Sequence, residues 1–167
     1  TRIPKEPLLL FEYQSELYFG DIGPKLMKVN SSGVSIAWKT YETYPTEFPL
    51  QLVEYKGSLY FMLADFTGFD DRKVESIWKY NKSIGAKEMS DINALTHGSW
   101  KSDTFLLFAS QDHLYLHLSY QEGVFKPDKS VVLKSDGDSF SLSRAVPSLE
   151  DKKVTWIHGE HNGLQYF

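Results

Sequence analysis

The chain has 167 residues, with 18 Lys and Arg against 22 Asp and Glu and no cysteine, so its formal net charge is −4. This length suits a single domain over residues 1–167. The acidic balance disfavours nucleic-acid binding, because phosphate contacts need a basic surface. The apolar runs are far shorter than a membrane-spanning helix requires. The absence of cysteine excludes disulfides, thiolate metal sites and cysteine nucleophiles.

The first forty residues predict four short strands joined by tight turns. Runs rich in Tyr, Phe, Val, Ile and Trp, each bounded by turn-forming residues, cover 8–13, 16–22, 25–30 and 34–40. Asn30–Gly33 suits the last of these hairpins, because Asn and Gly tolerate a positive φ. Further along, no segment keeps a helical period over three turns, and 88–95 is predicted as a strand followed by a loop. The fold class is therefore all-β.

The same strand pattern returns along the chain. Leu17-Tyr18-Phe19 recurs as Leu59-Tyr60-Phe61 and as Leu114-Tyr115-Leu116, and more loosely near the end of the chain. The predicted repeats cover about 8–40, 50–92 and 104–145, with a partial repeat over 153–167. We expect the three anchor leucines to be buried at equivalent positions on the second strand of each repeat.

Repeats of this length with four strands each are typical of β-propeller blades. The sequence thus predicts a propeller-like fold of about three and a half four-stranded antiparallel blades, with a β-trefoil as the alternative. Three and a half blades do not close a ring, so residues 1–167 are expected either to be a fragment of a larger propeller or to be completed by a protein partner or a second chain. The apolar edge within Lys153–Phe167 is the expected contact, because an unprotected edge strand recruits another strand.

A family resemblance lies on the second repeat. Between Leu52 and Asn93 the chain carries Gly57–Phe61, Glu75–Asn81 and Ser90–Asn93. These segments resemble a blade of a family of secreted β-propellers, which reads Gly-x-Leu-Tyr-Phe, then Glu-Leu-Trp-x-x-Asp-Gly-Thr, then Val-x-Asp-Ile-Asn-Pro-Gly. The resemblance implies a propeller blade in a secreted or cell-surface module without a defined chemistry.

Catalysis and metal binding find little support. His113 and His117 lie four apart on a predicted strand, so we expect them to share a half-exposed face opposite apolar leucines. His158 and His161 flank a predicted turn, and the acidic loops lack the spacing of a calcium site. We therefore expect no catalytic residue, no metal and no cofactor. A sialidase-like glycan hydrolase fragment and a structural half of a larger propeller remain as alternatives.

The candidate binding residues lie in two loops that are longer than their counterpart in the first repeat, Asp65–Glu75 and Ser119–Lys129. Loops on a rigid scaffold commonly carry binding sites, and these combine aromatic anchors with charge. The residues are Phe66, Phe69, Asp70, Asp71, Arg72, Tyr120, Glu122 and Phe125. The predicted function is a non-catalytic recognition or adhesion module, extracellular or at a cell surface, that binds protein or glycan.

Two sequons, at Asn30 and Asn81, would accept glycans in a secretory pathway. They are consistent with a secreted or cell-surface glycoprotein.

Overall fold

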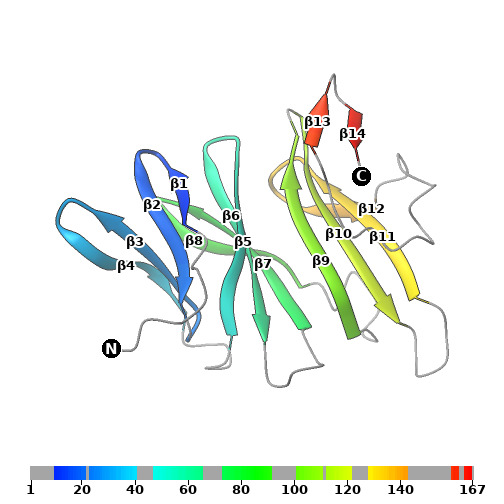
Figure 1. The fold of residues 1–167 in the computed structure, drawn as a ribbon, viewed down its shortest axis with the longest axis horizontal. Helices are drawn as coiled ribbons and strands as arrows, with labels where there is room; N and C mark the ends of the chain where they lie inside the picture. Colours follow the sequence, from blue (N-terminus) through cyan, green and yellow to red (C-terminus); the bar gives the residue numbers. More distant parts are fainter. Residues whose placement is uncertain are drawn as a thin grey trace.

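A computed structural model describes residues 10–21, 23–40, 47–65, 73–91, 101–110, 112–121, 128–142, 159–161 and 164–166. Every regular element in this part of the chain is a β-strand, which confirms the all-β class. Three four-stranded antiparallel sheets stand side by side, and a small hairpin lies near the C-terminus (Figure 1).

Each sheet is built from four consecutive strands in chain order. Sheet 1 contains β1 (Phe11–Tyr13), β2 (Glu16–Asp21), β3 (Lys25–Asn30) and β4 (Gly33–Lys39). Sheet 2 contains β5 (Glu47–Tyr55), β6 (Ser58–Asp65), β7 (Lys73–Asn81) and β8 (Gly85–Asp91). Sheet 3 contains β9 (Lys101–Ala109), β10 (Leu114–Gln121), β11 (Asp128–Ser135) and β12 (Phe140–Leu142). Among the described residues, each four-stranded sheet pairs its strands in the order in which they follow one another in the chain.

The predicted strands of the first forty residues are confirmed to within a few residues at each end. The strand expected to start at 88 begins earlier, at Gly85, because the turn after Asn81 is short. Near the C-terminus, β13 (Gly159–His161) and β14 (Leu164–Tyr166) pair with each other as a two-stranded sheet, and neither pairs with another described strand. Residues 153–158 lie outside the described part of the chain.

The third and fourth strands of every sheet are joined by the same kind of turn. An Asn or Asp that ends the third strand or directly follows it accepts a hydrogen bond on Oδ1 from the backbone N–H two residues on, which mimics a backbone turn. The pairs are Asn30 with Ser32 at 2.9 Å, Asn81 with Ser83 at 2.9 Å and Asp136 with Asp138 at 3.2 Å. The hairpin predicted at Asn30–Gly33 is confirmed.

Sheets 1 and 2 pack face to face over an aromatic core. Sheet 1 contributes Tyr13, Tyr18 and Leu26, all with no exposed surface. Sheet 2 contributes Leu59, Phe61, Leu63, Trp78 and Tyr80. The Trp38 and Trp78 rings lie with centroids 4.7 Å apart across this interface. Because successive side chains of a strand point to opposite faces of the sheet, these residues lie on one face of sheet 2, and sheet 1 packs against that face.

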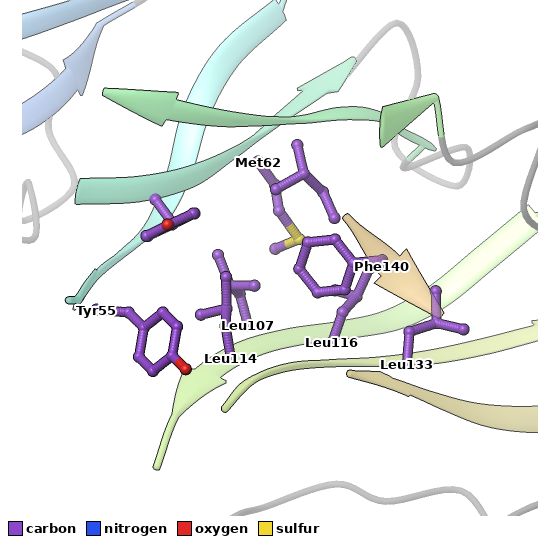
Figure 2. Close-up of a cluster of buried hydrophobic side chains, with 9 residues drawn as sticks. Tyr55, Met62, Leu107, Leu114, Leu116, Leu133 and Phe140 are labelled. Atoms are coloured by element: carbon purple, nitrogen blue, oxygen red, sulfur yellow. The ribbon is translucent and has the colours of Figure 1, made fainter. Parts of the chain in front are cut away.

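The other face of sheet 2 packs on sheet 3. Residues between those that face sheet 1, such as Tyr60 and Met62 on β6, belong to this second core. Figure 2 shows Met62 pointing into it. Sheet 3 contributes a set of mostly aliphatic side chains to this core, Leu107, Leu114, Leu116, Leu133 and Phe140. Each fully buried side chain of this size contributes about 1.5–3 kcal/mol through the hydrophobic effect. Sheet 2 is thus buried on both faces.

The three anchor leucines lie on the second strand of their sheets, as predicted, but their burial differs. Leu59 and Leu114 have no exposed surface, whereas Leu17 is 38% exposed. The prediction that Leu17 is buried is therefore wrong. Leu59 packs against sheet 1 and Leu114 against sheet 2. No described sheet lies on the corresponding side of sheet 1, which explains the exposure of Leu17.

A close backbone approach joins sheet 1 to sheet 2 at Gly20. A Cβ placed on Gly20 would lie 2.0 Å from the carbonyl oxygen of Pro49 on β5. Only glycine leaves room for this approach, since real Cβ atoms essentially never come closer than 3.0 Å to another heavy atom. The contact sets the spacing between the two sheets at this point.

Candidate binding surfaces

The loops between the second and third strands all start from one side of the molecule. The strand ends that border these loops lie along the lower side of the molecule in Figure 1. The bordering residues are Asp21 and Lys25 in sheet 1, Asp65 and Lys73 in sheet 2, and Gln121 and Asp128 in sheet 3. We call this side the loop rim. Identical strand order in the three sheets places equivalent connections on one rim.

Most of the predicted binding residues belong to the loop-rim segments 66–72 and 122–127, which lie outside the described residues. These are Phe66, Phe69, Asp70, Asp71, Arg72, Glu122 and Phe125. Tyr120 is different, because it lies within β10, paired with Lys129 and Ser102. The expected loops Asp65–Glu75 and Ser119–Lys129 were too long, since the strand ladders extend into both from each side.

The opposite rim, which carries the short hairpin turns, holds the sheets together through tyrosine hydroxyls. The Tyr13 hydroxyl donates to the carbonyl of Gly57, in the β5–β6 turn, at 2.8 Å. The Tyr55 hydroxyl donates to the carbonyl of Asp112, just before β10. Both tyrosines end the first strand of their sheet, and both acceptors stand two residues before the next anchor leucine. The same contact therefore occurs at both sheet junctions.

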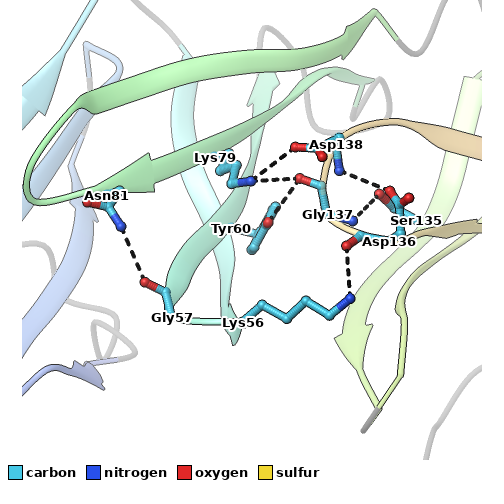
Figure 3. A network of polar contacts seen from close by, with 9 residues as sticks. All are labelled: Lys56, Gly57, Tyr60, Lys79, Asn81, Ser135, Asp136, Gly137 and Asp138. Carbon is cyan, nitrogen blue, oxygen red and sulfur yellow. Dashed lines mark hydrogen bonds and ion pairs between the residues drawn. The ribbon is translucent and has the colours of Figure 1, made fainter.

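The acidic turn Asp136-Gly137-Asp138, which has the composition of a cation-binding loop, is occupied by sheet 2 (Figure 3). The Gly137 carbonyl accepts hydrogen bonds from the Tyr60 hydroxyl at 3.1 Å and from Lys79 Nζ at 2.9 Å. Lys79 Nζ also lies 3.3 Å from the Asp138 carboxylate. This turn has a structural role at the junction of sheets 2 and 3.

An ionic cluster occupies the matching place between sheets 1 and 2. The Glu16 carboxylate lies 2.7 Å from Lys82 Nζ and 3.6 Å from Lys28 Nζ, and it accepts a hydrogen bond from the Tyr18 hydroxyl at 3.0 Å. The Lys82 and Tyr18 hydrogen bonds lower the pKa of Glu16 to about 2. Burial, followed by the hydrogen bond to Glu16, raises the pKa of Tyr18. Glu16 is therefore an anion and Tyr18 a neutral donor throughout the physiological range.

A small polar pocket opens beside the β11–β12 turn. Its volume is about 200 Å³, and its lining combines a cation, a carboxylate, an imidazole and three hydroxyls. The lining residues are His113, Lys134, Ser135, Asp136, Ser139 and Ser141. Sequence reasoning missed the pocket, because only the β11–β12 hairpin and the end of β9–β10 bring these residues together.

The histidine pair does not share a half-exposed face, so that prediction is wrong. His117 lies inside β10 with no exposed surface, and neither ring nitrogen has a hydrogen-bond partner. Burial lowers the pKa of His117 to about 4, so the ring is neutral. The apolar face predicted opposite it is confirmed for Leu114 and Leu116, which are fully buried. Among the residues that the structure describes, no group of three or more His, Asp or Glu side chains is placed to hold a metal ion.

Comparison of the chain with protein-family models, curated proteins and solved structures finds no match. Among the residues whose placement is described, no helix has the length and apolar character needed to cross a membrane.

Proposed function

We propose that the chain is a non-catalytic recognition module of propeller type, which binds a protein or a glycan through its loop rim. The observation that carries the proposal is the common origin of the loop-rim segments. The strand ends that border 66–72 and 122–127 lie on one side of two adjacent, tightly packed sheets. Binding groups on a rigid scaffold lose little conformational freedom when a ligand binds.

The amino acids of the two segments support this proposal. They contain Phe66, Phe69 and Phe125 together with Asp70, Asp71, Arg72 and Glu122. Aromatic side chains surrounded by charge are typical of protein-binding anchors, and aromatic rings also stack on sugars. Tyr120, near the end of β10, would stand at the base of the same rim.

A secreted or cell-surface location belongs to the same proposal. Asn30 lies in an exposed turn, where its Oδ1 accepts the turn hydrogen bond and its side chain also hydrogen-bonds the Glu16 carboxylate. The Nδ2 of Asn81 donates to the Gly57 carbonyl at 3.4 Å. Because Asn30 is exposed and Asn81 is half-buried, we expect Asn30 to be the better acceptor of the two. Both turns lie on the rim opposite the loop rim, where a glycan would leave the proposed binding side free.

The test replaces 66–72 and 122–127 together by the three-residue Ile-Gly-Pro sequence that joins β2 to β3 in sheet 1. The probes are an array of defined oligosaccharides and intact cultured cells, with and without protease or deglycosylation treatment. We expect fluorescently labelled wild type to bind, and the double-loop variant to lose at least tenfold in binding with little change in melting temperature. Protease-sensitive binding identifies a protein ligand, and deglycosylation-sensitive binding identifies a glycan.

The matched control is Ile84→Ser, which alters a 77% exposed apolar residue in the β7–β8 turn on the opposite rim. This variant is expected to bind like wild type. Binding that survives removal of both loops, or that is lost in the Ile84 variant, would contradict the proposal.

A further inference from the structure

The outward side of sheet 3 carries a row of aromatic and polar residues close to the hairpin turns. Strand pairing places one residue of each of the four strands in this row, namely Phe108, Tyr115, Lys134 and Ser141. Their neighbours along the strands, such as Leu107, Leu114 and Leu133, belong to the core shared with sheet 2. Because successive side chains of a strand alternate, the row faces away from that core, and none of its members is buried. We call these four residues the outer row.

The outer row adjoins the polar pocket beside the β11–β12 turn. Lys134 and Ser141 belong to the row and also line the pocket. The Phe108 and Tyr115 rings stack, with their centroids 5.2 Å apart and an angle of 13° between their planes. His113, which also lines the pocket, has its ring centroid 5.9 Å from that of Tyr115. A stacked aromatic pair therefore lies next to a polar pocket of about 200 Å³.

Two charged groups of the pocket keep binding capacity that the fold does not use. Among the described residues, no carboxylate forms an ion pair with the Lys134 ammonium. The Asp136 carboxylate accepts the turn hydrogen bond of Asp138 on Oδ1, and in the same part of the chain no hydrogen bond or ion pair reaches its Oδ2. Lys56 Nζ donates to the Asp136 carbonyl and not to this carboxylate. By contrast, the Asp138 carboxylate lies 3.3 Å from Lys79 Nζ of sheet 2 (Figure 3).

The pocket lining indicates the chemistry of its ligand. Lys134 and Asp136 carry opposite charges, so a ligand with one net charge would be repelled by one of them. A hydroxyl group both donates and accepts hydrogen bonds, so a neutral polyol can bind to both side chains. The faces of the neighbouring aromatic rings favour a ligand that also has an apolar side. A pyranose has both, and a single ring suits a volume smaller than that of sites for drug-sized molecules.

We propose that this pocket binds one neutral pyranose unit of a glycan. Lys134 donates to hydroxyls of the sugar, Asp136 Oδ2 accepts from them, and the C–H face of the ring lies on the side of Tyr115. The pocket lies at the hairpin turns of sheet 3, so it is a second site, separate from the proposed loop-rim site on the opposite side of the molecule. Because a single sugar unit has only about a dozen non-hydrogen atoms, it binds with a Kd of about 1 to 10 mM.

The experiment titrates the isotope-labelled full chain with the methyl glycosides of glucose, galactose and mannose, up to about 50 mM, and follows the amide signals by NMR. At least one glycoside is expected to shift the amides of His113, Lys134 and Asp136 in a saturable manner, while the amides of sheet 1 stay in place. The double-loop variant of the previous subsection is expected to bind the same glycoside like wild type. This result distinguishes the pocket from the loop rim, whichever of the two proposals fails.

Two variants each remove one polar group from the pocket. Asp136→Asn preserves the turn, because Asn accepts the same turn hydrogen bond at Asn30 and Asn81, and it replaces the Oδ2 acceptor by a donor. Lys134→Gln removes the ammonium group from a half-buried side chain. Each variant is expected to weaken binding about fivefold or more, since both lost hydrogen bonds are charge-assisted. Lys87→Gln, at an exposed position of β8 in sheet 2, removes the same charge outside the pocket and is expected to bind like wild type.

Three results would overturn the proposal. The first is the absence of a saturable shift with all three glycosides, and the second is binding that either pocket variant leaves unchanged. The third is loss of binding in the double-loop variant, because the sugar would then bind at the loop rim. Acetate and glycine serve as charged probes of similar or smaller size. If either binds at the same amides more tightly than every glycoside, the ligand is ionic and the assignment of a neutral sugar is wrong.

Discussion

Truncating the anchor leucines separates burial from sequence pattern, because Leu17 and Leu59 occupy the same position in their sheets. Leu59→Ala removes three carbon atoms from a site with no exposed surface, inside the core between sheets 1 and 2. The lost transfer free energy is about 2.4 kcal/mol at about 0.8 kcal/mol per carbon. The cavity left behind adds to this, so the expected loss of unfolding free energy is about 2–5 kcal/mol.

Leu17→Ala is the matched control for that measurement. Leu17 is 38% exposed and points away from sheet 2, so truncation leaves no enclosed cavity. We expect a loss of about 1.5 kcal/mol or less, because Leu17 is only partly buried. Leu114→Ala, fully buried between sheets 2 and 3, is expected to resemble Leu59→Ala.

The assay is urea denaturation followed by tryptophan fluorescence at about 2 μM. The denaturant dependence must be the same in all three variants, so that shifts in midpoint report stability. Equal losses for the Leu17 and Leu59 variants, or a loss below about 1 kcal/mol for Leu59→Ala, would refute the claim that packing between sheets stabilises this chain.

Three further perturbations test the junctions and the buried histidine. Gly20→Ala should cost about 3 kcal/mol or more in the same assay, because its Cβ would overlap the Pro49 carbonyl; a variant as stable as wild type would show that the sheets separate freely. Tyr13→Phe should cost about 1 kcal/mol through loss of its hydrogen bond to Gly57, and an unchanged midpoint would mean that water replaces that bond. The pKa of His117 is about 4 in the folded chain against 6.5 normally, so folding favours the neutral ring and stability falls as pH drops below 6.5. The loss at pH 5 relative to pH 7.5 should be about 2 kcal/mol, and His117→Leu should remove this part of the pH dependence; a pH profile identical to wild type would contradict the assignment.

Much of the local structure followed from sequence because strand alternation and turn chemistry act over a few residues. The runs of Tyr, Phe and Val predicted the strands of sheet 1 to within a few residues, and Asn30–Gly33 predicted its hairpin. The recurrence of Leu-Tyr at Leu17, Leu59 and Leu114 located the second strand of all three sheets. Their loop-rim connections came out too long, because ladder hydrogen bonds extend strands into polar segments that carry no strand signal.

Burial was harder to predict, since it depends on the neighbour of each sheet. Leu17 and Leu59 share a local pattern, yet only Leu59 has a sheet packed against it. His117 was expected on a half-exposed face, because alternation shows which residues share a side and not what covers that side.

The amino-acid sequence by itself determined the all-β class, the four-strand units and the turns between them, because these depend on side-chain alternation and on residues that accept turn conformations. Only the tertiary structure decided which tyrosine hydroxyls bridge the sheets, where the polar pocket of His113 and Lys134 forms, and that Leu17 is partly exposed whereas Leu59 is buried. The physical reason is distance along the chain. These features join groups from different sheets, such as Tyr13 with Gly57 and Tyr60 with Gly137, and no local pattern specifies how one sheet is set against the next.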